Sequence, residues 1–147
     1  MWPFTRSPSY SKNLDVLVAV ITHLGYTDWN MRSPRNLAKA LGVKEGRVLF
    51  VLDNFPAFFR QAGFVSSKGS TFYQLHVRHA IRWKEGESED ESKEAPLEPS
   101  TVNAMIDVAV KCADQERRHS LGYLTVTVAA LISIIGAIIT LWARRGC

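Results

Sequence analysis

The sequence has few of the residues from which disulfide frameworks, metal sites and catalytic centres are built. Its two cysteines, Cys112 and Cys147, are too few for a disulfide framework, and its four histidines show no metal-ligand spacing. It contains no glycine-rich phosphate loop, nucleophile elbow or HExxH pattern. The densest carboxylates fall in a polar stretch too mobile to hold catalytic geometry. We therefore expect a non-enzymatic protein with no cofactor, no metal and no small-molecule substrate.

Charged residues are also missing from a long stretch near the carboxyl end. Residues 121–142 contain no Asp, Glu, Lys or Arg, and Arg144 and Arg145 follow shortly. At about 1.5 Å per residue, a helix of this length covers the ~30 Å hydrocarbon core of a bilayer. The first residues lack the apolar run of a signal peptide. This pattern predicts a single-pass, tail-anchored membrane protein with a transmembrane helix over 121–142, a tail over 143–147 and a cytoplasmic amino-terminal domain.

The predicted transmembrane helix carries small residues at spacings of three, four and seven, which place them on one stripe. Small residues allow the backbones of two membrane helices to approach closely. We expect a homo-oligomer, or pairing with another membrane protein, through Gly122, Ala129, Ser133, Gly136 and Thr140. The alternative is that small residues are simply frequent in membrane helices.

Charge is strongly segregated along the rest of the chain. Residues 1–84 hold 12 Lys and Arg against 4 Asp and Glu, a net charge of +8, whereas residues 85–99 hold one Lys against seven acids, a net charge of −6. The basic region suggests an acidic partner such as nucleic acid, anionic lipid or an acidic protein segment. The acidic stretch is poor in apolar residues, so we expect a disordered linker. It is either a plain spacer or an autoinhibitory segment that covers the basic surface.

The basic region contains three predicted helices. Apolar residues recur at helical spacing over 14–24 and again over 48–55. Between them, Ser33 followed by Pro34 is typical of a helix start, and Gly42 is typical of a helix end.

A two-stranded hairpin is predicted after these helices, over 64–66 and 71–77. In the second strand Tyr73, Leu75 and Val77 alternate with polar residues, which predicts one buried and one polar face.

This order of elements is that of winged-helix domains, and the run Leu37-Ala38-Lys39-Ala40-Leu41-Gly42-Val43 resembles their helix-turn-helix signature. The resemblance covers about residues 12–82 and places Lys68-Gly69 at the tip of the wing. It implies an α+β fold with three helices and a hairpin over 1–84, followed here by the linker over 85–99 and an amphipathic juxtamembrane helix over 100–120. A generic small domain with the same pattern is the alternative.

The third helix of a winged-helix domain normally reads DNA bases with polar side chains. In this chain the side opposite its buried stripe carries Phe50 and Asp53, which disfavour base readout. We interpret this side as a protein-binding surface formed by Arg47, Phe50, Asp53 and Asn54. The alternative is that Phe50 packs against the amino-terminal segment or the loop with Trp29.

Other cations are spread over the domain in a way that suits non-specific contacts with phosphates or lipid headgroups. The candidate nucleic-acid or anion contacts are Arg32, Arg35, Lys39, Lys68, Arg78 and Arg82.

Three functions are compatible with these features. The first is a membrane-anchored module that recruits or senses a cytoplasmic macromolecule, with a protein as the favoured partner. The second is a membrane-tethered DNA-binding protein that resembles transcription regulators in its order of parts. The third is a membrane-disrupting defence effector that is triggered by clustering.

Overall fold

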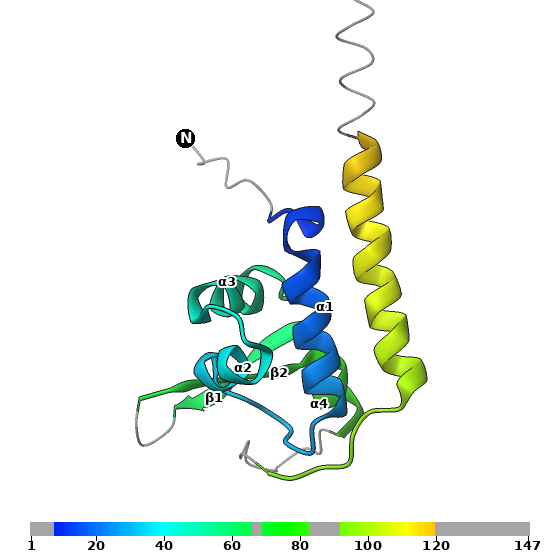
Figure 1. The fold of residues 1–147 in the computed structure, drawn as a ribbon. Coiled ribbons are helices and arrows are strands. Elements are labelled where there is room, and N and C mark those ends of the chain that lie inside the picture. The colour runs from blue at the N-terminus through cyan, green and yellow to red at the C-terminus, as the bar shows by residue number, and fades with distance from the viewer. Residues whose placement is uncertain (1–7, 66–68, 83–91, 120–147) are drawn as a thin grey trace, which may run out of the picture. The chain divides into compact units, whose positions relative to one another are not determined.

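The computed structural model describes residues 8–65, 69–82 and 92–119. Over these ranges the chain is α+β, with five helices and a two-stranded sheet (Figure 1). The chain divides into two units, one that extends to Ala113 and one that begins at Asp114. Of the second unit residues 114–119 are described, and they are helical.

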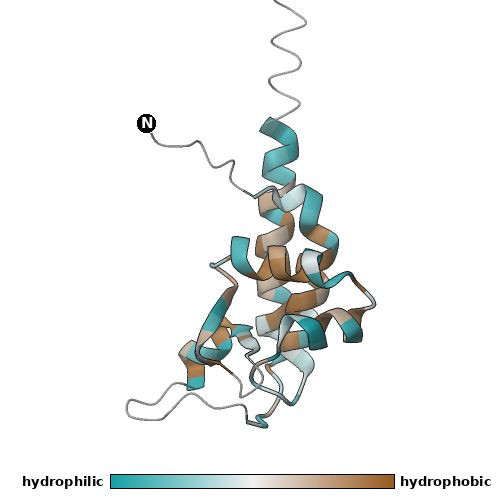
Figure 2. Ribbon diagram, turned by 90° about the vertical axis from the view of Figure 1, so that its left-hand side faces the viewer, coloured by the Kyte–Doolittle hydropathy of each residue, from teal (hydrophilic) through white to brown (hydrophobic). Residues whose placement is uncertain are grey.

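Three helices form the first half of the fold, as their apolar spacing predicts: α1 (Tyr10–Tyr26), α2 (Pro34–Leu41) and α3 (Glu45–Asn54). The predicted start and end of α2 are confirmed, because the Ser33 hydroxyl accepts a hydrogen bond from the Asn36 N–H and Gly42 ends the helix at φ 65°. The apolar sides of the helices (brown in Figure 2) meet in one core. Its helical members include Val16, Leu17, Val20, Ile21, Leu24, Leu37, Val48, Val51 and Leu52.

The sheet joins β1 (Phe59–Val65) to β2 (Thr71–Leu75) in antiparallel register, with Phe59 opposite Leu75 and Val65 opposite Thr71. The other edge of β2 is anchored to the segment before α2. There the backbones of Arg32 and Tyr73 exchange two hydrogen bonds of 2.9 Å. This contact fixes the start of α2 beside the sheet.

The alternating pattern predicted for residues 71–77 is wrong. The second strand ends at Leu75, and a fourth helix, α4 (His76–Arg82), begins at once. Gln74 and Arg78, expected on a polar face, are only 4% and 1% exposed. The reason is the change of backbone period at residue 76, which turns Arg78 toward the core instead of outward.

Residues 92–97, which we call the strap, are hydrogen-bonded to the end of α1 and to the loop that follows it, so this part of the predicted linker is wrong. Backbone hydrogen bonds lead from the Asn30 N–H to the Ser92 carbonyl (3.1 Å), from the Glu94 N–H to the Asp28 carbonyl (2.6 Å) and from the Leu97 N–H to the Gly25 carbonyl (2.9 Å). Most hydrogen bonds of the strap are made by its backbone atoms. The residue types in this segment therefore do not show that it is bound to the domain.

A fifth helix over 99–119 follows the strap, and in the first unit it lies beside α1 (Figure 1). Val102, Ala109 and Ala113 are completely buried. The approach to α1 is close, since a Cβ on Gly25 would lie 2.7 Å from Cγ2 of Val102. A side chain at position 25 would therefore force Val102 to shift. The last described turns of the helix are hydrophilic (Figure 2).

The predicted fold class, a three-helix winged-helix domain with a flexible linker and a transmembrane helix, is therefore wrong. The domain continues through α4, the strap and residues 99–113. Within the described part of the chain, no helix is both long enough and apolar enough to cross a membrane. The span predicted for 121–142 lies outside the described residues.

Candidate functional site

One side of α3 faces away from the core and carries large apolar side chains. We call it the α3 surface, and it consists of Glu45, Gly46, Leu49, Phe50 and Asp53, all of which are exposed. Leu49 is 38% exposed and Phe50 is 45% exposed. Phe50 thus lies outside the core, as the helical spacing predicts.

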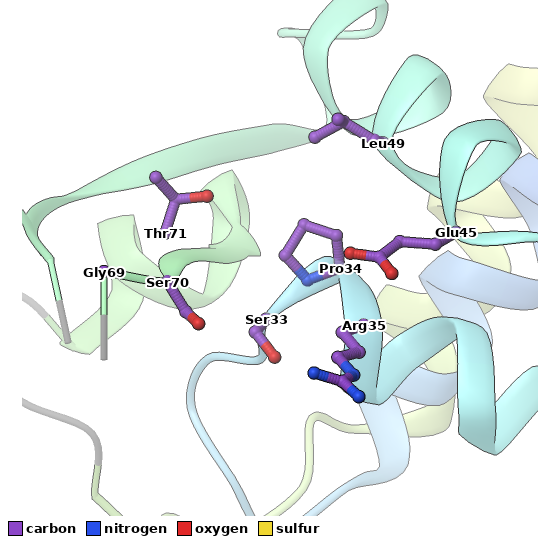
Figure 3. A pocket seen from close by; sticks show the side chains of 8 residues that line it. All are labelled: Ser33, Pro34, Arg35, Glu45, Leu49, Gly69, Ser70 and Thr71. Carbon is purple, nitrogen blue, oxygen red and sulfur yellow. The ribbon is translucent and has the colours of Figure 1, made fainter. Parts of the chain in front are cut away.

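A pocket of about 450 Å³ opens beside the α3 surface. Three elements enclose it: the first turn and middle of α3, the start of α2, and the beginning of β2 with the turn before it (Figure 3). Their juxtaposition follows from the bridge between Arg32 and Tyr73, which holds the start of α2 next to β2. The pocket is lined by Ser33, Pro34, Arg35, Glu45, Leu49, Gly69, Ser70 and Thr71.

Among the four predicted partner-binding residues, three are engaged within the chain. The Arg47 guanidinium donates to both carboxylate oxygens of Asp15 on α1, at 3.1 and 3.2 Å. The Asn54 side-chain amide donates to the Phe50 carbonyl at 2.8 Å. Asp53 accepts a 2.6 Å hydrogen bond from the hydroxyl of Tyr73. Phe50, the fourth member of this set, has an exposed side chain.

The hydrogen bond between Tyr73 and Asp53 predicts a loss of stability at high pH. Burial, the hydrogen bond to Asp53 and the negative charge of Asp53 together raise the pKa of Tyr73 to about 12. Because the folded state favours the neutral phenol, this stabilisation is complete below pH 10 and is lost as the pH rises through 12. We expect the free energy of unfolding, measured with denaturant, to fall over this range in the native chain.

Tyr73→Phe is expected to remove this fall and to lower stability at neutral pH by about 1–3 kcal/mol, since a bond to a carboxylate is lost. Tyr26→Phe is the matched control, because Tyr26 is 44% exposed. A Tyr73→Phe variant that loses as much stability as the native chain over this pH range would contradict the assignment.

Some of the residues predicted to contact anions are exposed, and others interact with groups of the same chain. Arg35 and Lys39 are exposed one turn apart on α2, and within the described ranges neither side chain has an ionic or hydrogen-bonding partner. Arg32 is half-buried, and its guanidinium carbon lies 5.3 Å from the ring centre of Trp29. Lys68 lies outside the described residues.

Arg78 is an internal structural residue and is not on the surface. Its guanidinium donates to the carbonyls at the end of α1 and in the following loop, and to the carbonyls of Glu94 and Ala95 in the strap. Burial lowers the pKa of Arg78, while the Glu94 carboxylate, 3.4 Å from Nε, acts in the opposite direction. Arg82 pairs with the same carboxylate at 2.5 Å. Neither arginine is free to hold a phosphate.

No protein-family model, no curated protein and no solved structure matches the chain. Function is therefore inferred from the described residues. The residues predicted for association in the membrane all fall within 120–147, outside the described part of the chain.

Sequence reasoning missed Leu49 and the pocket beside it. Leu49 lies on the flank of the apolar stripe of α3, where a leucine is normally covered by the core. It is exposed because the start of β2 stands away from it and leaves the pocket. The position of β2 depends on the backbone bridge between Arg32 and Tyr73. The residues near either position in the sequence do not predict this bridge.

Proposed function

We propose that this protein is a non-enzymatic recruiting module that binds another protein through the α3 surface. The observation that carries this proposal is the exposure of two adjacent large apolar residues, Leu49 and Phe50, beside a pocket of about 450 Å³. Large apolar side chains next to a concave site are typical of protein interfaces, where a few anchoring residues supply most of the binding energy.

DNA binding is the second candidate, and the free cations Arg35 and Lys39 favour it. The α3 surface opposes it, because Glu45 and Asp53 would repel phosphates and Leu49 offers no hydrogen bond to a base edge. Two further cations that the sequence assigned to this role, Arg78 and Arg82, are bound to the strap. A protein partner therefore accounts for more features of the α3 surface than DNA does.

Site-specific photocrosslinking in cells that express the full chain tests the proposal. A photoreactive benzoylphenylalanine at position 50 is expected to give a protein adduct that nuclease does not remove. The same residue at position 81 is the matched control, because Ile81 is also a large exposed apolar residue, at 62%, but lies on α4. Leu49→Asp in the same chain is expected to abolish the adduct at position 50. Equal adducts at both positions, or an adduct that nuclease removes, would overturn the proposal.

Gly46 offers a way to block the surface without weakening the fold. It lies one turn before Phe50 on α3, and a Cβ added there would meet nothing within 4 Å. Since glycine disfavours helix, Gly46→Gln is expected to raise the free energy of unfolding by up to about 1 kcal/mol. The new side chain would nevertheless cover the approach to Phe50, so the adduct at position 50 should be lost.

Gly42→Gln is the matched control for this prediction. Gly42 also has open space around it, but its φ of 65° disfavours any side chain. We expect this variant to lose about 1 kcal/mol of stability and to keep the adduct. Retention of the adduct in a stably folded Gly46→Gln variant would show that the partner does not approach over this part of α3.

A further inference from the structure

We infer that the partner segment is an acidic peptide with a large apolar side chain, which enters the pocket beside Leu49 while its carboxylates contact α2. This inference rests on the proposed function and names the chemistry of the partner.

The apolar half of the inference comes from the lining of the pocket. Leu49, the ring of Pro34 and the methyl group of Thr71 provide its apolar atoms (Figure 3). Its volume of about 450 Å³ falls within the range of roughly 300–1,000 Å³ that is typical of ligand pockets. Phe50, exposed on the neighbouring position of α3, extends this apolar area outside the pocket.

The acidic half of the inference comes from charges around the pocket. Arg35 lines it, Lys39 follows one turn later on α2, and Lys44 directly precedes α3; all three are exposed. None of these three side chains has an ionic or hydrogen-bonding partner within the described ranges. Two acids, Glu45 and Asp53, lie on the α3 surface, and Asp53 keeps its negative charge although it accepts a hydrogen bond from Tyr73. Both acids belong to α3, so the charge on the α2 side is positive, and carboxylates complement it there.

Other occupants fit these features less well. A nucleic acid would use the cations but would leave Leu49 and Phe50 without apolar contacts. The acidic stretch of a second copy, Glu85-Gly-Glu-Ser-Glu-Asp-Glu91, contains no apolar side chain to fill the pocket. An acidic segment that includes a large apolar side chain complements both the apolar lining of the pocket and the cations around it.

Fluorescence anisotropy with the purified full chain tests the inference. The probes are a short labelled peptide of Asp and Glu interspersed with Leu and Phe, a version with Lys in place of the acids, a version with Ser in place of the apolar residues, and a DNA duplex. We expect the first peptide to bind and the other probes to bind at least about tenfold more weakly. Phe50→Ser and Leu49→Ser should each weaken the first peptide by about fivefold or more, and Arg35→Glu should weaken it and reduce its salt dependence. Ile81→Ser, an exposed change on α4, should have no effect, and thermal unfolding will confirm that each variant is folded.

The outcomes separate this inference from the proposed function. If no peptide binds, or the Lys peptide binds equally well, while the photocrosslinked protein at position 50 still forms, the inference is wrong and the proposed function stands. If the DNA duplex or the peptide without apolar residues binds as tightly as the first peptide, and only Arg35→Glu weakens it, the site is a polyanion site and the inference is overturned. If the photocrosslinked protein is also absent, the proposed function fails as well.

Discussion

A chain that ends at residue 84 is expected to lose cooperative unfolding, although the sequence predicts this fragment as a complete domain. The truncation removes the strap and the helix after it, so Leu97, Val102, Ala109 and Ala113 no longer cover the core. Full burial of a single valine or leucine side chain stabilises a protein by about 1.5–3 kcal/mol. The loss therefore approaches the roughly 5–15 kcal/mol that separates folded from unfolded states in most proteins.

A chain that ends at residue 119 is the control, because it keeps every described element. Unfolding by denaturant, followed by circular dichroism, should show a sharp transition for this longer chain and a broad, low-amplitude change for the shorter one. If both chains unfold with the same midpoint and slope, residues 92–113 contribute little to the fold. That result would restore the domain boundary at residue 84.

The first half of the fold could be predicted because its signals are local. The apolar spacing of α1 and α3 and the caps of α2 at Ser33 and Gly42 depend on residues within a few positions of each other. The strap could not be predicted in the same way. Residues 92–97 are bound largely through backbone atoms, to which the Glu94 carboxylate and the buried Leu97 side chain add, and composition alone cannot distinguish such a segment from a solvated linker.

The candidate site likewise contains some features that could be predicted from the sequence and others that could not. The exposure of Phe50 follows from its angular position on α3 and could be predicted. The engagement of Asp53 could not, because its partner Tyr73 lies 20 residues away. Arg78 was misplaced because Tyr73, Leu75 and Val77 have the period of a strand, while the backbone becomes helical at His76. A periodic pattern does not show where one kind of backbone replaces another.

Arg78 is the single side chain whose loss is expected to destabilise the protein most. It is 1% exposed, and its two terminal nitrogens donate to five carbonyls in two segments that are distant in the sequence. Nη1 contacts the carbonyls of Leu24, Thr27 and Trp29 at 2.9–3.0 Å, and Nη2 contacts those of Glu94 and Ala95 at 3.1–3.2 Å. Arg78 therefore joins the end of α1 to the strap.

Arg78→Met keeps most of the side-chain volume but removes every one of these donors, so buried carbonyls lose their partner and the Glu94 carboxylate is left with Arg82 alone. We expect the free energy of unfolding to fall by about 3–5 kcal/mol. Arg78→Lys should recover only part of this loss, because one ammonium group cannot reach carbonyls on both segments. Arg82→Met is the matched control: it removes an ion pair to the same Glu94 carboxylate and a hydrogen bond to the Ala95 carbonyl, but from a side chain that is 28% exposed, and it should cost about 1 kcal/mol or less. Equal losses for the two methionine variants would contradict the role of Arg78, because the difference between them rests on the carbonyls that Arg78 alone brings together.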